Sequence, residues 1–193
     1  MQALLAFSRA VDRLNRSIAK VALWLVLVAV LVSAGNAVMR KAFDLSSNAW
    51  LELQWYLFGA VYLLVAAYTL ERNEHIRIDI ISNALSKRLR DWIDVFGHVV
   101  FLLPFVIVML LETTPFLLTS FRLQEMSPNA GGLMIWPAKA LMLVGFAMLL
   151  LQGLSELIKR IAVMRGLIDE PAPTHSGHVV AEELIAVMEK RDD

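Results

Sequence analysis

The 193-residue chain contains no cysteine, which excludes disulfide bonds, thiolate metal sites and cysteine nucleophiles. Only 19% of its residues are charged, below the roughly 25% typical of soluble domains, whereas 58% are hydrophobic. Eighteen basic and eighteen acidic residues cancel to zero net charge, so the broad electrostatic basis for binding nucleic acid is missing. The mean hydropathy of +0.62 excludes a water-soluble globule.

Long stretches without charge are the main signal in the sequence. Residues 21–39, 53–70 and 95–111 carry no charged side chain at all. About 20 apolar residues in a helix cross the hydrocarbon core of a bilayer. We therefore predict an all-α membrane protein, because lipid-exposed backbone must satisfy its own hydrogen bonds and the alternation of barrel strands is missing. The four predicted transmembrane helices cover about 18–39, 50–70, 95–118 and 135–157.

Basic residues gather on one side of this four-span arrangement. Four precede the first span, five lie between the second and third spans, and three follow the fourth. The opposite side holds only Arg40, Lys41 and Arg122, with Lys139 near its edge. Because basic residues favour the cytoplasmic side, both termini are expected to be cytoplasmic.

Two segments outside the spans, about 3–17 and 79–93, are predicted to be amphipathic surface helices. Apolar side chains recur in both at the i, i+3, i+4 spacing of a helix that lies on a membrane. In the first, the apolar stripe is Leu4, Phe7, Val11, Leu14 and Ile18, and the polar face is Arg9, Asp12, Arg13 and Arg16. Residues 1–165 are expected to form one membrane domain, followed by a partly disordered cytoplasmic tail over 166–193.

No residue pattern indicates catalysis. The four histidines do not supply facing pairs inside the bundle, so a bis-histidine haem lacks ligands. The serines have no pattern of histidine and aspartate partners. We therefore predict that the chain is not an enzyme and has no catalytic, cofactor-binding or metal site.

Ionisable residues at membrane depth are better pointers to function, because a charge near a helix centre costs at least about 2.5–3.5 kcal/mol. Glu52 and Lys139 lie close to span ends and are expected to reach the headgroups by snorkelling. Glu112 lies deepest, after seventeen uncharged residues. For Glu112, interface anchoring and a functional role both stay open.

Three stretches stand out as a set: residues 36–43, residues 46–56 and Glu74-His75-Ile76-Arg77-Ile78-Asp79. Together they closely resemble the small permease subunit (DctQ type) of tripartite ATP-independent periplasmic (TRAP) transporters. Residues 125–133 and 136–139 look like the branch usually labelled mannitol/chloroaromatic compound transport. The similarity covers about residues 5–160, and the His-x-Arg-x-Asp element is its most specific part.

The resemblance implies a division of labour between three proteins. In that family a periplasmic binding protein delivers an organic acid to a large permease (DctM type), which holds the substrate and sodium sites. The chain is then a fixed scaffold beside the large permease in the bacterial inner membrane, with membrane lipids as further partners and no cofactor or metal of its own. The candidate structural or partner-interface residues are Arg40, Trp50, Glu52, His75, Arg77, Asp79, Glu112 and Lys139.

Three further interpretations concern the loops and a rival function. The loop at 119–132, with Arg122 and Glu125, is the candidate contact with the binding protein. Arg77 and Asp79 are expected to tie the loop before the second surface helix. The alternative function is a free-standing four-span channel or membrane scaffold; in a channel, Glu52, Gln54 and Tyr56 come closest to a pore lining.

Overall fold

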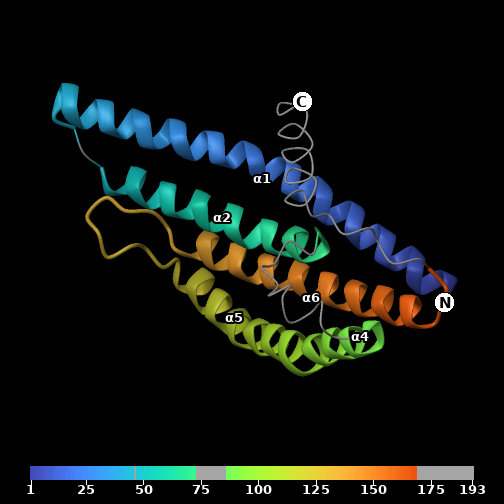
Figure 1. Ribbon diagram of the computed structural model, residues 1–193. Helices are drawn as coiled ribbons and strands as arrows, with labels where there is room; N and C mark the ends of the chain where they lie inside the picture. The colour runs from blue at the N-terminus through green and yellow to red at the C-terminus, as the bar shows by residue number, and fades with distance from the viewer. Residues whose placement is uncertain (46, 73–85, 169–193) are drawn as a thin grey trace, which may run out of the picture.

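The computed structural model describes residues 1–45, 47–72 and 86–168. These residues form an elongated bundle of helices, shown in Figure 1. Its elements are α1 (Gln2–Phe43), α2 (Asn48–Arg72), α4 (Lys87–Phe96), the π-helical segment η1 (Gly97–Leu102), α5 (Leu103–Leu123) and α6 (Trp136–Met164). Within these ranges the only β structure is an isolated bridge between Met126 and Met134.

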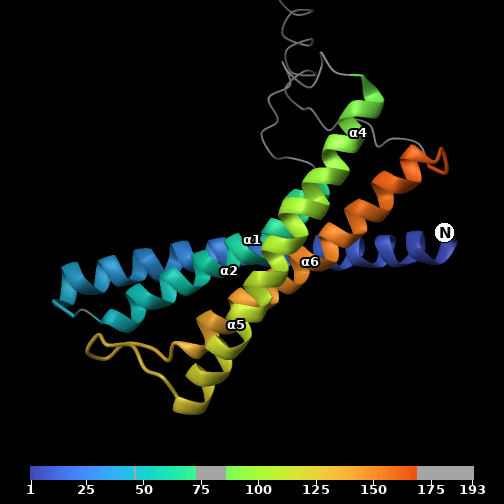
Figure 2. The ribbon, with the colours of Figure 1, turned by 90° about the horizontal axis from the view of Figure 1, so that it is seen from below.

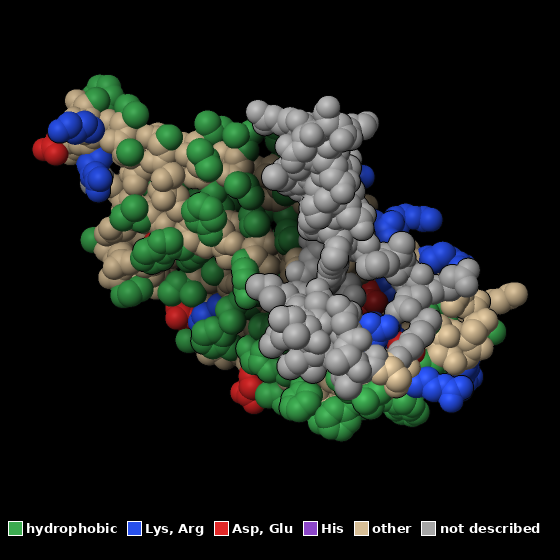
Figure 3. Space-filling view, in the orientation of Figure 1, with side chains coloured by type: hydrophobic (Ala, Val, Ile, Leu, Met, Phe, Trp, Pro, Cys, Tyr) green, Lys and Arg blue, Asp and Glu red, His purple; other side chains and the backbone are tan. Residues whose placement is uncertain are grey.

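Four helical stretches are long and apolar enough to cross a membrane: α1, α2, the run from Arg88 to Leu123, and α6. The prediction of an all-α protein with four membrane helices is therefore confirmed. In Figure 3, hydrophobic side chains are spread over the visible described surface between the two ends, and most of the Lys and Arg side chains in view lie toward the ends of the molecule. This distribution fits a protein whose middle lies in hydrocarbon and whose ends lie in water.

The bundle has two distinct ends. One, here called the loop end, holds the end of α1, the start of α2 and the loop that joins α5 to α6 (Figure 1). The other, here called the terminal end, holds the N-terminus and the end of α6. Among the described helices, α6 contacts every other one, and α2 packs against both α1 and α6. Figure 2 shows α1 running obliquely across α6.

Helix α1 is a single element of 42 residues, although the sequence suggests a division between a surface helix at 3–17 and a span at 18–39. Residues 1–34 contain no glycine or proline, so the backbone has no helix-breaking residue between the expected surface helix and the expected span. At about 1.5 Å per residue α1 is about 63 Å long, twice the thickness of the hydrocarbon core. The helix ends where Asp44 adopts a left-handed conformation with φ of 56°.

The third span is also longer than predicted. The described part of the expected surface helix at 79–93 is α4, which continues through η1 into α5 instead of forming a separate element. The wider π turn directly precedes Pro104, whose ring clashes with the carbonyl four residues earlier in a regular α-helix. The local widening lets the helix continue through this proline.

Small and polar residues, rather than large apolar ones, face the interior of the bundle. Leu4, Phe7 and Leu14 of the predicted apolar stripe are exposed, and Asp12 of the predicted polar face is buried. Lipid tails are as apolar as leucine, so helices in a membrane are held by close packing of small residues and by polar contacts. The buried residues of α1 are Ser8, Val11, Asp12, Asn15, Ala19, Ala22 and Ala29.

Gly145 marks the closest approach between α6 and α2. A Cβ atom at this position would lie 2.8 Å from Leu63 Cβ and 3.1 Å from the Leu63 carbonyl oxygen. Real side chains do not approach that closely without displacing a helix. The absence of a side chain at Gly145 therefore sets the spacing of the two helices.

Candidate functional site

The carboxylate of Glu52 holds the α5–α6 loop in place at the loop end of the bundle. Glu52 lies in the second turn of α2 and is only 4% exposed. One carboxylate oxygen accepts hydrogen bonds from the Ser127 hydroxyl and from Asn129 Nδ2 at 2.8 Å. The other accepts a hydrogen bond from the backbone N–H of Leu133 at 2.6 Å. We call these four residues the Glu52 clamp.

The loop inside the clamp folds back on itself. The N–H of Ser127 donates to the Leu133 carbonyl at 2.9 Å, and the N–H of Ile135 donates to the Glu125 carbonyl at 2.9 Å. At the tip, Gly131 has a φ of 69°, which favours glycine. A Cβ at Gly132 would lie 2.6 Å from Ser127 Cβ and 2.7 Å from Glu52 Oε1, so only glycine fits beneath the carboxylate.

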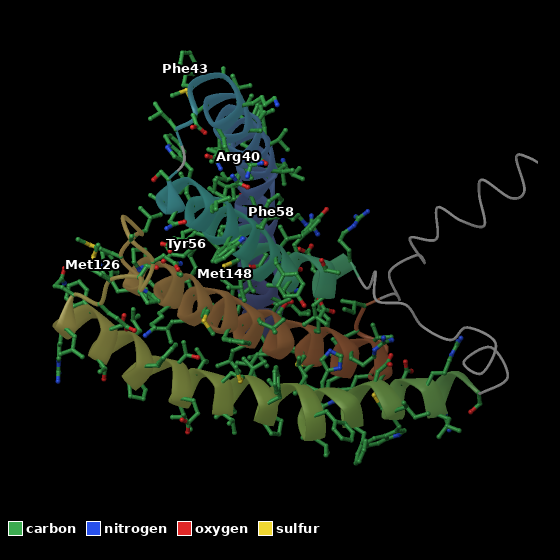
Figure 4. All side chains as sticks on the ribbon, turned by 90° about the vertical axis from the view of Figure 1, so that its left-hand side faces the viewer. Arg40, Phe43, Tyr56, Phe58, Met126 and Met148 are labelled. Atoms are coloured by element: carbon green, nitrogen blue, oxygen red, sulfur yellow. The ribbon has the colours of Figure 1, made fainter. Side chains whose placement is uncertain are left out.

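Two further residues of α2 extend the contact with the loop. Asn48 donates from Nδ2 to the Ala130 carbonyl at 3.0 Å. Tyr56 donates from its hydroxyl to the Met134 carbonyl at 3.0 Å. In Figure 4, Tyr56 and Met126 both lie toward the loop end of the bundle. The α2 residues Asn48, Glu52 and Tyr56 lie four apart on one helical face, so this face as a whole carries the loop.

Lys139 joins the loop to the start of α6. Its ammonium nitrogen lies 2.5 Å from Glu125 Oε2 and 3.7 Å from the centre of the Phe116 ring. The hydrogen bond from Lys139 is the main reason that the pKa of the Glu125 carboxyl lies below its usual range. Lys139 is 7% exposed, so it does not extend along the helix surface into headgroups as the sequence suggests. Its charge is neutralised inside the protein instead.

A second polar cluster ties α1 to α6 nearer the terminal end. The Asp12 carboxylate accepts hydrogen bonds from Gln152 Nε2 at 3.0 Å and from Lys159 Nζ at 3.2 Å. Asn15 Nδ2 donates to Gln152 Oε1 at 2.6 Å, and the hydroxyls of Ser8 and Ser155 share a hydrogen bond of 2.5 Å. We call these residues the α1–α6 polar network: Ser8, Asp12, Asn15, Gln152, Ser155 and Lys159.

Other ion pairs complete the terminal end. Arg160 contacts Asp91 at 3.2 Å and Asp94 at 2.5 Å, which joins α6 to α4. Arg16 of α1 contacts Glu71 of α2 at 2.5 Å. Within α6, Glu156 contacts Lys159 at 2.5 Å. Neighbouring basic residues near the end of α6 thus reach different helices.

The comparison with protein families gives the chain its context. The family model for "Tripartite ATP-independent periplasmic transporters, DctQ component" matches residues 29–163, which is 135 of the 193 residues. The chain belongs to this family. It is therefore a membrane component of a TRAP transporter and not an enzyme. No curated protein and no solved structure matches the chain.

Two of the stretches that resemble DctQ proteins in sequence meet in the Glu52 clamp. Trp50-Leu51-Glu52-Leu53-Gln54-Trp55-Tyr56 supplies the carboxylate, and Glu125-Met126-Ser127-Pro128-Asn129-Ala130-Gly131-Gly132-Leu133 supplies the loop. The stretch at 74–79, with His75, Arg77 and Asp79, lies outside the described residues. Most of the predicted tail over 166–193 also lies outside them.

The other candidate residues of this DctQ component lie on its surface. Arg40 is exposed in the last turn of α1, close to Phe43, which marks the end of that helix in Figure 4. Arg122 is exposed in the last turn of α5, and Glu112 is exposed in the same helix. Trp50 lines an apolar hollow of about 320 Å³ between α1 and α2, together with Val28, Leu31, Val32, Gly35, Asn36 and Met39.

The sequence singled out Glu52, Lys139 and Glu125 but not the α1–α6 polar network. Gln152 and Ser155 carried a signal, because they are polar residues within the last apolar run. Asp12 and Asn15 carried none, because a polar side chain in an amphipathic helix is ordinarily assigned to water. Nowhere in the described ranges do three or more His, Cys, Asp or Glu side chains gather as a metal site requires.

Proposed function

We propose that this DctQ-family chain is the fixed scaffold of a TRAP transporter in the bacterial inner membrane. It packs beside a large permease (DctM type) and supports sodium-coupled uptake of an organic acid, which a periplasmic binding protein delivers. Substrate and sodium bind in the large permease, and this chain needs no cofactor. Both termini face the cytoplasm, and the loop end faces the periplasm.

The observation that carries this proposal is that buried polar side chains hold different segments of the chain together. In the described ranges, Glu52, Lys139, Asp12 and Gln152 each contact another segment of the same chain. Transporters place unpaired polar groups and broken helices around a site near the midplane. Polar groups that connect helices to each other and to a loop instead make a rigid body, which is the property a scaffold needs.

The channel alternative loses its main support. Glu52, Gln54 and Tyr56 were the closest to a pore lining, but the Glu52 carboxylate and the Tyr56 hydroxyl contact the α5–α6 loop. Side chains committed to these contacts are not available to line a path for ions.

The α5–α6 loop is the proposed contact with the periplasmic binding protein. Its exposed residues Met126, Pro128 and Ala130 are presented on a turn that the Glu52 clamp fixes. A preformed loop binds with less loss of conformational freedom than a flexible one. The loop residues also carry the resemblance to the mannitol/chloroaromatic branch, to which we assign the chain.

The test is co-purification of the chain, in mild detergent, with a co-expressed large permease of the same transporter. A stoichiometric complex, together with loss of organic-acid uptake into proteoliposomes under an inward sodium gradient when this chain is omitted, supports the scaffold. Full uptake by the large permease without this chain contradicts it. A homo-oligomer that conducts ions without the large permease supports the channel instead.

A further inference from the structure

Glu112 is a carboxylate on the outer face of a membrane helix. Its side chain is exposed in the middle of α5 and makes no hydrogen bond or ion pair with any residue in the described ranges. Lys139, which lies over the ring of Phe116 one turn farther along α5, is already paired with Glu125. The charge on Glu112 is therefore unmatched within this part of the chain.

The position of Glu112 separates it from the other acidic residues of the loop end. Glu52 lies in the second turn of its helix, and Glu125 lies in the loop. Glu112 lies eleven residues before the end of α5 and one turn, about 6 Å, farther from the loop end than Phe116. Nine uncharged residues separate it from Arg122 and seventeen from Asp94. A carboxylate so placed is unfavourable in hydrocarbon unless it meets a donor.

The face around Glu112 is shaped for another helix rather than for water. Phe105, Val108 and Phe116, at seven and four residues before it and four after it, share its side of α5. They are 55%, 54% and 50% exposed. Val106 and Thr113 are buried and mark the side of α5 that packs into the bundle, while the half-exposed rings of Phe105 and Phe116 also contact Phe146 and Lys139 of α6. The outer face thus presents one carboxylate within an apolar stripe.

We propose that Glu112, with Phe105, Val108 and Phe116, binds a transmembrane helix of the large permease that presents a lysine or arginine side chain. This inference rests on the proposed function, which supplies the partner. Charge complementarity selects the occupant: a base neutralises the carboxylate, whereas acyl chains offer no donor and lipid phosphates repel it. The aromatic and branched neighbours then exclude water and strengthen the ion pair.

Cross-linking tests the location of this face without altering Glu112. The photoreactive residue p-benzoylphenylalanine replaces Phe105, and in a matched control it replaces Ile107, which is 45% exposed and lies on the other side of α5. In the purified complex, irradiation should cross-link the probe at Phe105 to the large permease and leave the probe at Ile107 mainly on lipid. Equal cross-linking from both positions, or a cross-link to a second copy of this chain, overturns the proposal.

Charge reversal tests the role of the carboxylate. Glu112→Lys should lower the amount of large permease recovered per chain at least about tenfold, because two bases then face each other. Thr114→Lys is the matched control, because it places the same charge on the other side of α5 only two residues away. Glu112→Gln, which keeps the shape, should give an intermediate loss.

The outcomes separate this inference from the proposed function. If the unaltered chain fails to recover the large permease, the scaffold proposal fails. If the unaltered chain and Glu112→Lys recover it equally, the scaffold stands and the Glu112 contact is wrong. If Glu112→Lys and Thr114→Lys lose it equally, a charge at this depth disrupts the helix itself and Glu112 has no specific role.

Discussion

Single residues at the loop end act through partners that are distant in the sequence. Glu52 and Lys139 stood out in the sequence because ionisable side chains are costly in a membrane helix. What each one contacts depends on the tertiary fold, since Asn129 and Leu133 follow Glu52 by 77 and 81 residues. Snorkelling, the ordinary expectation for such residues, is not needed when donors or acceptors of the protein already surround the charge.

Removing the Glu52 carboxylate should loosen the loop. Glu52→Ala leaves Asn129 and the Leu133 N–H without their acceptor, so the melting temperature in detergent should fall by several degrees. Amide hydrogen exchange at Leu133 should accelerate at the same time. Glu52→Gln keeps one acceptor oxygen and should give a smaller effect; equal stability of all three proteins would show that the clamp contributes nothing.

Gly132 should tolerate no side chain. In Gly132→Ala the new methyl group meets Ser127 and the Glu52 carboxylate, and the overpacking should cost about 1–3 kcal/mol of unfolding free energy. Gly59→Ala is the control, because no atom lies within 4 Å of a Cβ at Gly59 and alanine favours the helix. Thermal or denaturant unfolding of the two variants checks the prediction, which fails if both behave alike.

The pairing of Glu125 with Lys139 should respond to acid only below the ordinary range of a glutamate. Its pKa is lowered by the Lys139 hydrogen bond, so the stabilisation is complete above the unfolded pKa and disappears as the pH falls through the lower folded value. A carbon-13 NMR titration of the Glu125 carboxyl measures this midpoint. Lys139→Met should raise it; an unchanged midpoint would remove Lys139 as the cause.

At the scale of helices, the sequence predicted which segments cross the membrane but not which of their faces meet. Long uncharged runs identify membrane helices directly, because the hydropathy of a segment indicates whether it can lie in the hydrocarbon core. The interior of the bundle follows the opposite pattern: Ser8, Asp12 and Asn15 face inward while Leu4 and Phe7 face outward. The amphipathic pattern therefore indicated a membrane-surface helix but not that Asp12 and Asn15 would contact α6 inside the bundle. The boundaries between surface helices and spans could not be located from the sequence either. Helix α1 and the continuous run α4–η1–α5 contain no helix-terminating residue at the expected boundaries.

The contact between Asp12 and Lys159 should couple α1 to α6 energetically. A double-mutant cycle with Asp12→Asn and Lys159→Met should give a coupling energy of about 1–3 kcal/mol, since both side chains are largely buried. Arg13→Ala, at an exposed position of the same turn, should change stability little. Additive effects of Asp12→Asn and Lys159→Met would mean that the two groups do not interact.

For the whole molecule, the four membrane helices place the N-terminus and the end of α6 at the same end of the bundle. From the distribution of basic residues we propose that this end faces the cytoplasm. The absence of cysteine makes this orientation directly measurable, because any introduced thiol is unique in the chain.

Thiol labelling should place the two ends on opposite sides of the membrane. Ala130→Cys, at the exposed tip of the loop, should react with a membrane-impermeant maleimide in spheroplasts. Arg13→Cys should react only after the membrane is opened, and in inside-out vesicles the pattern should reverse. Labelling of Arg13→Cys in intact spheroplasts would invert the proposed orientation.

The length and inclination of α1 relate this protein to the thickness of its membrane. An oblique helix crosses a thicker bilayer by standing more upright and a thinner one by leaning further. The α1–α6 polar network fixes one part of α1, and α2 packs along the helix, so neither adjustment leaves the bundle undisturbed. The acyl-chain length of the surrounding lipid therefore affects both the tilt of α1 and its packing against α2 and α6. Bilayer thickness is thus one of the determinants of the shape of the subunit.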